Sequence, residues 1–167
     1  MVIASYPNYV HLSAGDLLRE ESKKDTDNAK IIQEVFKAGK LVPTRITCSL
    51  LRDAILTISH KKKEGIKFLI DGYPRNKENM DGWNDVIGDK ITVNHALYLD
   101  CSKDILKERL LKRKRKDDVP EIIEKRFATF EKEELPVILG LESRGILRKL
   151  DASKSPKEVY ENAKKFF

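Results

Sequence analysis

The sequence predicts an α/β fold in which a parallel sheet carries helices on both faces. Segments with the composition of strands alternate with segments of helical periodicity along the chain, and such alternation is typical of parallel sheets. The apolar run Phe68–Ile70 is long enough for a strand buried on both faces, and Asp71-Gly72 followed by Pro74 ends it abruptly. Asp71 and Arg75 therefore stand at the carboxyl end of a strand, where open α/β sheets bind their ligands.

The amino-terminal part is predicted to begin with a short strand, Tyr9–Leu12, and to continue as a helical lobe over residues 14–60. Ser13 can cap the first helix of this lobe, because Asp16 follows three residues later. A second helix is expected over 28–38, and a third is indicated by apolar residues at helical spacing from Ile46 onward. Because this block interrupts the alternation of strands and helices, we expect it to be inserted between two strands.

The carboxyl-terminal part returns to alternating elements. Asn76 can cap the helix that follows the central strand, Pro136 suits the opening of a helix, and Ser155-Pro156-Lys157-Glu158 forms a capping box. The expected strands are 95–100 and 146–150, and the expected helices are 78–86, 103–113, 119–132, 136–143 and a terminal helix after Ser155.

Composition is that of one globular domain over residues 1–167, with 40% hydrophobic and 36% charged residues. No apolar run approaches the ~20 residues of a membrane-spanning helix, and the amino end does not resemble a signal peptide. Cys48 and Cys101 lack metal-ligand spacing, so two buried, reduced thiols are expected. These features predict a cytoplasmic monomer. The net charge of +6 favours an anionic partner, either a phosphorylated small molecule or a nucleic acid.

Arginines are placed where a phosphate-binding protein would need them. Guanidinium groups bind two phosphate oxygens at once, and phosphoryl transfer needs dispersed positive charge because negative charge spreads over the equatorial oxygens of its transition state. Any one of these residues by itself is more typically a solvated surface residue, so the prediction depends on the pattern. The residues at strand ends, in loops or on adjoining helices are Arg19, Arg75, Arg109, Arg113, Arg115 and Arg126.

Four motifs together resemble the adenylate kinase family, and within it the UMP/CMP kinase branch. They stand in the family's order, with nearly its spacing, and they cover essentially the whole chain. They are His11-Leu-Ser-Ala-Gly-Asp-Leu-Leu-Arg19, Leu41-Val-Pro43, Asp71-Gly-Tyr-Pro-Arg75, and Arg115-Lys-Asp-Asp118 followed by Lys125-Arg126.

The resemblance implies a nucleoside monophosphate (NMP) kinase fold of the P-loop type, with a small helical NMP-binding insertion at 14–60 and a short lid at 113–118 that moves to exclude water. It implies that ATP and Mg²⁺ take part, and that UMP or CMP accepts the phosphoryl group. The roles it assigns are these: Ser13, Ala14, Gly15, Arg19, Val42, Gly72, Arg75 and Asn79 bind the acceptor; Arg109 and Arg113 bind ATP; Arg75, Arg113, Arg115 and Arg126 act on the transferring group; and Asp71 holds Mg²⁺ through water.

Two positions bear on the acceptor base. Ala14 stands where adenylate kinases usually carry Thr, and the Ala form resembles the UMP/CMP branch. Asn79 resembles the residue that reads a pyrimidine edge in that branch, and an amide can satisfy uracil or cytosine because it offers both a donor and an acceptor. The alternatives are that Asn79 packs or caps locally, and that the chain acts on AMP.

The sequence departs from the family in lacking the Gly-x-x-x-x-Gly-Lys phosphate loop and the strand before it. In the family that strand is central, between those expected at 68–70 and 95–99, so its loss leaves interior backbone groups unpaired at about 1–3 kcal/mol each. We therefore expect a truncated chain with little or no activity. One alternative is a regulatory nucleotide-binding protein without a phosphate loop.

A nucleic-acid binder is the other alternative, through the basic run 112–116, which also resembles a nuclear signal. Few aromatic residues lie near this run to stack on bases. Asp117 and Asp118 follow it directly and weaken its field, so nucleic-acid binding is not favoured.

Overall fold

The computed structural model describes residues 5–61, 65–88, 91–113, 115 and 117–167. Within these ranges the strands are β1 (Tyr9–Ser13), β2 (Lys67–Asp71), β3 (Ala96–Asp100) and β4 (Leu147–Asp151). The helices are α2 (Ala14–Glu21), α3 (Asp27–Ala38), α4 (Thr44–Lys61), α5 (Lys77–Val86), α6 (Lys103–Arg113), α7 (Pro120–Thr129), α8 (Leu135–Ser143) and α9 (Pro156–Ala163), with a π-helical turn η2 (Phe130–Glu134) and a 3-10 turn η3 (Lys164–Phe166).

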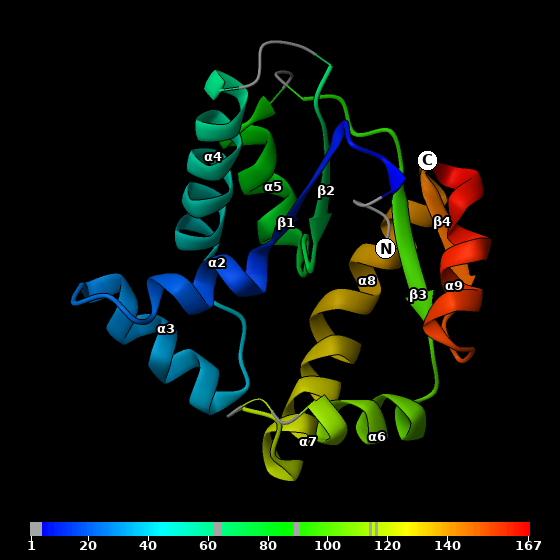
Figure 1. Cartoon of the computed structure of the whole chain (residues 1–167). Helices are drawn as coiled ribbons and strands as arrows, with labels where there is room; N and C mark the ends of the chain where they lie inside the picture. Colours follow the sequence, from blue (N-terminus) through cyan, green and yellow to red (C-terminus); the bar gives the residue numbers. More distant parts are fainter. Residues whose placement is uncertain (1–4, 62–64, 89–90, 114, 116) are drawn as a thin grey trace.

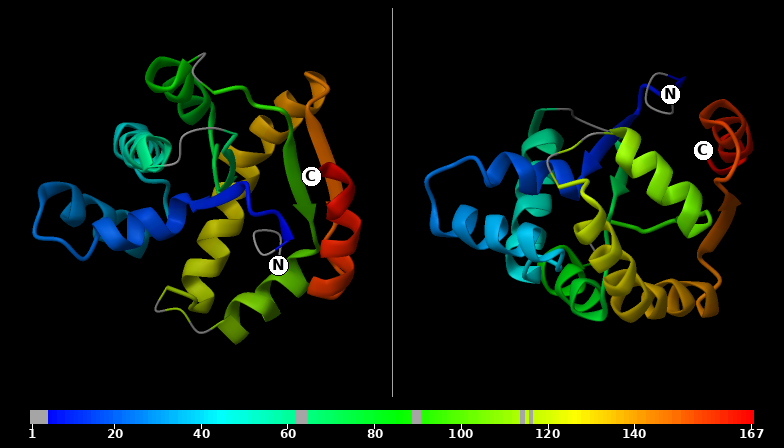
Figure 2. Two further views of the ribbon diagram at one scale, coloured as in Figure 1. Left: turned by 45° about the horizontal axis from the view of Figure 1, so that its top comes forward. Right: turned by 90° about the horizontal axis from the view of Figure 1, so that it is seen from below.

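The strands form two separate parallel pairs. β1 pairs with β2, from Tyr9 opposite Lys67 to Ser13 opposite Asp71, and β3 pairs with β4. Figure 1 shows the β1–β2 pair beside α4 and α5 on one side of the molecule and the β3–β4 pair beside α9 on the other. In Figure 1 and in the left view of Figure 2, the long helical segment formed by α7 and α8 is seen between the two pairs. The α/β class with parallel strands is therefore confirmed.

The expectation that Phe68–Ile70 is buried on both faces is wrong. All three side chains are only half-buried, because within the described residues β2 has a strand partner on one side alone. Within the described residues β3 likewise pairs with β4 alone, and Leu99 of β3 is 54% exposed. The sheet is thus divided at the place where the sequence predicts a missing strand.

Most of the hydrophobic core is formed by residues of the amino-terminal half of the chain. One cluster joins Leu12 of β1 to Leu51 and Ile55 of α4, with Trp83 of α5 packed against it. A second cluster holds α2, α3 and the start of α4 together through Leu18, Ile32, Val42 and Ile46. Through these apolar contacts, the helices that lie between β1 and β2 in the chain hold the ends of both strands in place.

The two helices expected at 119–132 and 136–143 are one continuous segment. Pro136 has no N–H to donate and its ring clashes with the carbonyl four residues earlier. The chain accommodates it by widening into η2, where the N–H of Leu135 donates to the carbonyl of Phe130, five residues back. Pro136 therefore alters the helical repeat without ending the helix.

Most of the remaining local predictions are confirmed. The side chains of Ser13, Asn76 and Ser155 cap α2, α5 and α9. Cys48 is buried and unpaired as expected, but Cys101 is only half-buried. None of the helices in the described ranges combines the length and apolar character that a membrane crossing requires.

Candidate functional site

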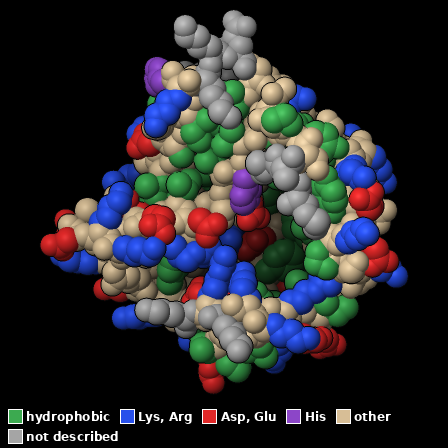
Figure 3. Space-filling model, viewed as in Figure 1, with side chains coloured by type: hydrophobic (Ala, Val, Ile, Leu, Met, Phe, Trp, Pro, Cys, Tyr) green, Lys and Arg blue, Asp and Glu red, His purple; other side chains and the backbone are tan. Residues whose placement is uncertain are grey.

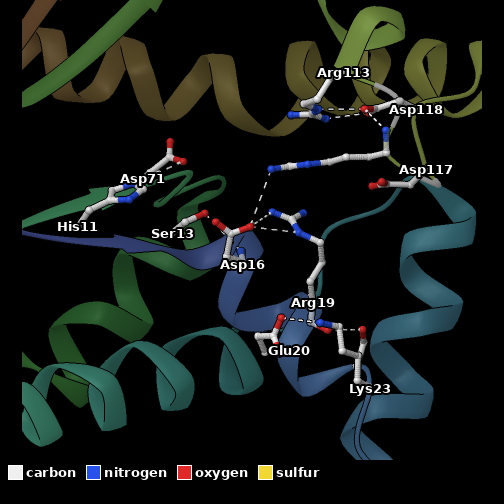
Figure 4. A network of polar contacts seen from close by, with 12 residues as sticks. His11, Ser13, Asp16, Arg19, Glu20, Lys23, Asp71, Arg113, Asp117 and Asp118 are labelled. Carbon is white, nitrogen blue, oxygen red and sulfur yellow. Dashed lines mark hydrogen bonds and ion pairs between the residues drawn. The ribbon is translucent and has the colours of Figure 1, made fainter. Parts of the chain in front are cut away.

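The carboxyl ends of β1 and β2 lie side by side, and this places Ser13 opposite Asp71. The Ser13 hydroxyl accepts a hydrogen bond from the N–H of Asp16 at 3.3 Å and so begins α2. Asp71 is exposed, with one carboxylate oxygen 3.9 Å from Nε2 of His11 (Figure 4). Oxygen atoms from two neighbouring strands therefore face solvent at one edge of the sheet.

Arg19 bends back along α2 toward the first turn of that helix. Its Nε and Nη2 donate to Oδ1 of Asp16 at 3.2 and 2.5 Å (Figure 4). A Cβ on Gly15 would lie 3.1 Å from Nη2 of Arg19, so the glycine leaves room for the guanidinium. Arg115 reaches the same carboxylate from the far side, at 3.9 Å. Hydrogen bonding from Arg19 lowers the pKa of Asp16.

A second carboxylate, Asp118, accepts hydrogen bonds from three arginines. Nε and Nη2 of Arg113 donate to its two oxygens at 2.9 and 2.7 Å, the main-chain N–H of Arg115 donates at 3.1 Å, and Nη1 of Arg126 approaches at 3.4 Å. Arg126 also donates to Asp117. The Asp118 side chain has no exposed surface, and hydrogen bonding from Arg113 holds its pKa below the ordinary value despite this burial.

Arg75 is bound to its own loop and faces a small cavity. Its Nε donates to the carbonyl of Gly72 at 2.8 Å. Gly72 has φ +73°, and a Cβ there would lie 2.9 Å from Nη2 of Arg75, so this turn requires a glycine. The cavity, of about 100 Å³, lies between the end of α3 and the α7–η2 segment; its lining includes Lys40, Arg75, Arg126 and Glu134.

Sequence reasoning did not find Lys40 or Glu134. Burial raises the pKa of Glu134, and the nearby charge of Arg75 works against that rise. The signal that was available is the position of Lys40 directly after the glycine that ends α3. Nothing in the local pattern distinguishes Glu134 from the other acidic residues of η2, since its place in the cavity depends on where the chain widens before Pro136.

The structure places Asn79 inside the molecule. It is 4% exposed; its Nδ2 donates to Oγ1 of Thr44 at 2.8 Å, and its Oδ1 accepts from the main-chain N–H of Arg75 at 3.1 Å. These contacts correspond to the local-packing alternative. Ala14 and Val42 are also buried, in the two apolar clusters.

Arg109 is the predicted site residue that lies apart from the others. Its guanidinium donates to the carbonyls of Ala152, Ser153 and Lys154 in the loop after β4, at 2.6 to 3.0 Å. All three acceptors are main-chain atoms, so Arg109 joins α6 to this loop. Binding of ATP by Arg109 stays a prediction.

The expected lid is described in part: Lys114 and Lys116 lie outside the described residues, so the basic run 112–116 is also incomplete. Across the described ranges, no group of three or more His, Cys, Asp or Glu residues could hold a metal ion. Figure 3 shows Lys and Arg side chains gathered along one rim of a hollow whose floor is partly hydrophobic. This arrangement can bind a polyanion that projects into the hollow.

The sequence is similar to known proteins over most of its length. The adenylate kinase family model matches residues 2–146. The chain is 43% identical over 164 residues to the UMP-CMP kinase of Bos taurus, covering 95% of this chain and 84% of that protein. It is 40% identical over 168 residues to the UMP-CMP kinase of Danio rerio (98% and 85%) and 42% identical over 167 residues to UMP-CMP kinase 3 of Oryza sativa subsp. japonica (99% and 76%).

The fold and these matches define the class as a phosphotransferase of the kinase type. The chain belongs to the adenylate kinase family. The resemblance expected from the four motifs is thus confirmed, whereas the individual residue roles stay predictions.

Proposed function

We propose that this protein transfers the γ-phosphoryl group of ATP to UMP or CMP, giving UDP or CDP. The observation that carries the proposal is that arginines from different elements share partners. Arg19 and Arg115 contact Asp16, and Arg113 and Arg126 contact Asp118. Arg126 also lines one cavity together with Arg75. The UMP-CMP kinases named above support a pyrimidine nucleotide as the acceptor.

The acceptor phosphate would bind between Arg75 and Arg19. Nε of Arg75 donates a hydrogen bond to the carbonyl of Gly72, and among the described residues no carboxylate forms an ion pair with Arg75. Its guanidinium therefore keeps donors for a ligand. Lys40, which also lines the cavity, adds a further cation. Charge-assisted hydrogen bonds from guanidinium groups to phosphate are roughly twice as strong as neutral ones.

Arg113, Arg115 and Arg126 would stabilise the transferring phosphoryl group. In the free protein they contact Asp16, Asp117 and Asp118. Because these carboxylates are acceptors of the same kind as phosphate oxygens, we propose that they hold the guanidinium groups in place until the phosphates replace part of these contacts. Movement of the lid, residues 113–118, would bring Arg113 and Arg115 onto the donor beside Arg126 of α7 and exclude water.

Asp71 and Ser13 present oxygen atoms next to each other, a donor set that suits Mg²⁺ held through its own water molecules. Bound Mg²⁺ would neutralise charge on the ATP phosphates. Asp71 would orient the water shell by accepting hydrogen bonds, and Ser13 would keep α2 and the adjoining main-chain N–H groups directed at the acceptor.

We further propose that this 167-residue chain by itself turns over slowly or not at all. The printed sequence contains no Gly-x-x-x-x-Gly-Lys motif whose amides and lysine would hold the donor β- and γ-phosphates. Arg113, Arg115 and Arg126 would act on the transferring group, and they would not replace the amides and the lysine of that motif.

Calorimetry with CMP, UMP and AMP, followed by a coupled assay with ATP and Mg²⁺, tests both parts. We expect CMP and UMP to bind more tightly than AMP, with Arg75→Lys weakening both at least tenfold because a lysine cannot bind two phosphate oxygens at once. Binding of no monophosphate would contradict the kinase assignment. Rapid turnover would confirm the reaction and refute slow turnover, whereas tight binding with slow or absent turnover is the result expected of a chain without the phosphate loop.

A further inference from the structure

Thr44 lies at a close crossing of two helices. It is the first residue of α4, it is 6% exposed, and α4 packs against α5. A Cβ built on Gly82 of α5 would be 2.5 Å from Cγ2 of Thr44. The methyl group of Thr44 is therefore pressed against the glycine backbone, and this contact restricts the side chain to an orientation in which its hydroxyl faces Asn79.

The Thr44 hydroxyl completes the hydrogen bonding of Asn79. Oδ1 of Asn79 has to face Arg75, because the main-chain N–H of Arg75 can only donate. Nδ2 of Asn79 then points at Oγ1 of Thr44, at 2.8 Å. Both ends of the amide are thus used, and Asn79 is also held by its own N–H, which donates to Oδ1 of Asn76 at 2.8 Å.

The same loop is fixed from a second direction. The hydroxyl of Tyr73 donates to the main-chain carbonyl of Asn79 and lies 3.0 Å from Sγ of Cys48, which belongs to α4. Side chains of α4 therefore hold the segment that carries Arg75 at two points, and Thr44 is the one that acts on the main chain of Arg75 through a single intermediate.

We infer that Thr44 is a positioning residue, which orients the amide of Asn79 and through it holds the main chain of Arg75 where its guanidinium meets the acceptor phosphate. The inference rests on the proposed function for its effect on nucleotide binding, but the link among the three residues does not. It also assigns Asn79 to the support of Arg75. Loss of Thr44 should then weaken UMP and CMP equally, because the phosphate is common to both.

The test compares Thr44→Val, which keeps the methyl group and replaces the hydroxyl with a second methyl, with Thr44→Ser, which keeps the hydroxyl. We expect Thr44→Val to weaken UMP and CMP about fivefold each, the effect of one buried hydrogen bond, and Thr44→Ser to restore most of the affinity. Amide hydrogen exchange of Arg75, followed by NMR in the free protein, should be faster in Thr44→Val. Thr47→Val, a change at another buried threonine of α4, is the matched control and should alter neither measurement.

A double-mutant cycle with Asn79→Ala completes the experiment, since Thr44→Val should have no further effect on binding once Asn79 is gone. Unchanged exchange at Arg75 in Thr44→Val would overturn the inference, as would faster exchange with unchanged affinity, or a change in the ratio of UMP to CMP affinity. If the unmodified protein binds neither nucleotide, the proposed function fails, while the exchange measurement still decides whether Thr44 holds Arg75.

Discussion

Asp118 accepts both Nε and Nη2 of Arg113, at 2.9 and 2.7 Å, with a carboxylate that has no exposed surface. The two residues are the first and the last of the expected lid, so their ion pair joins its two ends. The same carboxylate accepts from Arg126 of α7, and the lid is thereby tied to the helix that follows it.

Asp118→Asn should destabilise the protein by about 1–2 kcal/mol. Removing one partner of a fully buried pair costs more than this, but Arg113 and Arg126 keep 38% and 31% of their side chains exposed and regain contact with water. Urea unfolding measures the change. Asp25→Asn, at an exposed carboxylate, is the control and should have almost no effect; a similar loss in both variants would contradict a specific role for Asp118.

The contribution of Asp118 should depend on pH. Its pKa is lowered in the folded protein, chiefly by hydrogen bonding from Arg113, so the unfolded chain binds the proton more tightly. The stabilisation is therefore fully present above the ordinary pKa of 3.8 and is lost as the pH falls from there through the lower folded pKa. Unfolding of the unmodified protein and Asp118→Asn from pH 7 to pH 3 should give curves that converge below about pH 4; a constant difference across this range would disprove the linkage.

Glu134→Gln should stabilise the protein near neutral pH, because a neutral amide avoids the burial of a charge. Burial raises the pKa of Glu134, so the folded state favours the protonated form and loses stability as the pH rises from the ordinary value of 4.5 through the raised one. The gain from the neutral amide should accordingly disappear below pH 4.5, which thermal unfolding at several pH values would reveal. Glu34→Gln on the exposed face of α3 serves as the control.

Gly82→Ala should destabilise the crossing of α4 and α5 by about 1–3 kcal/mol, because the new Cβ would lie 2.5 Å from Cγ2 of Thr44 and 3.3 Å from Sγ of Cys48. Gly140→Ala in α8 is the matched control. Nothing lies within 4 Å of its Cβ position, so the better helix propensity of alanine should increase stability by about 0.5–1 kcal/mol. Thermal unfolding of both variants should show shifts of opposite sign; stabilisation in Gly82→Ala would mean that the helices separate easily.

Local signals predicted most of the elements because they act over a few residues. The caps at Ser13, Asn76 and Ser155 depend on a side chain and an N–H three residues apart, and the structure confirms them. Pro136 shows where such signals fail: its missing N–H predicts a helix boundary, but whether the helix ends or widens depends on the packing of the whole segment 120–143.

Sequence patterns were sufficient to predict that strands alternate with helices, that the arginines of interest lie at strand ends or beside them, and that Asp71 and Arg75 follow a strand. They also indicated where a strand is missing from the sheet. These features come from spacing along the chain, which propensity and periodicity express directly. The folded chain was needed to show that Glu134 enters the cavity, that Arg109 binds the loop after β4, and that Thr44 contacts Asn79. Each of these depends on contacts between residues distant in sequence, and no local preference specifies which distant partner a side chain will meet.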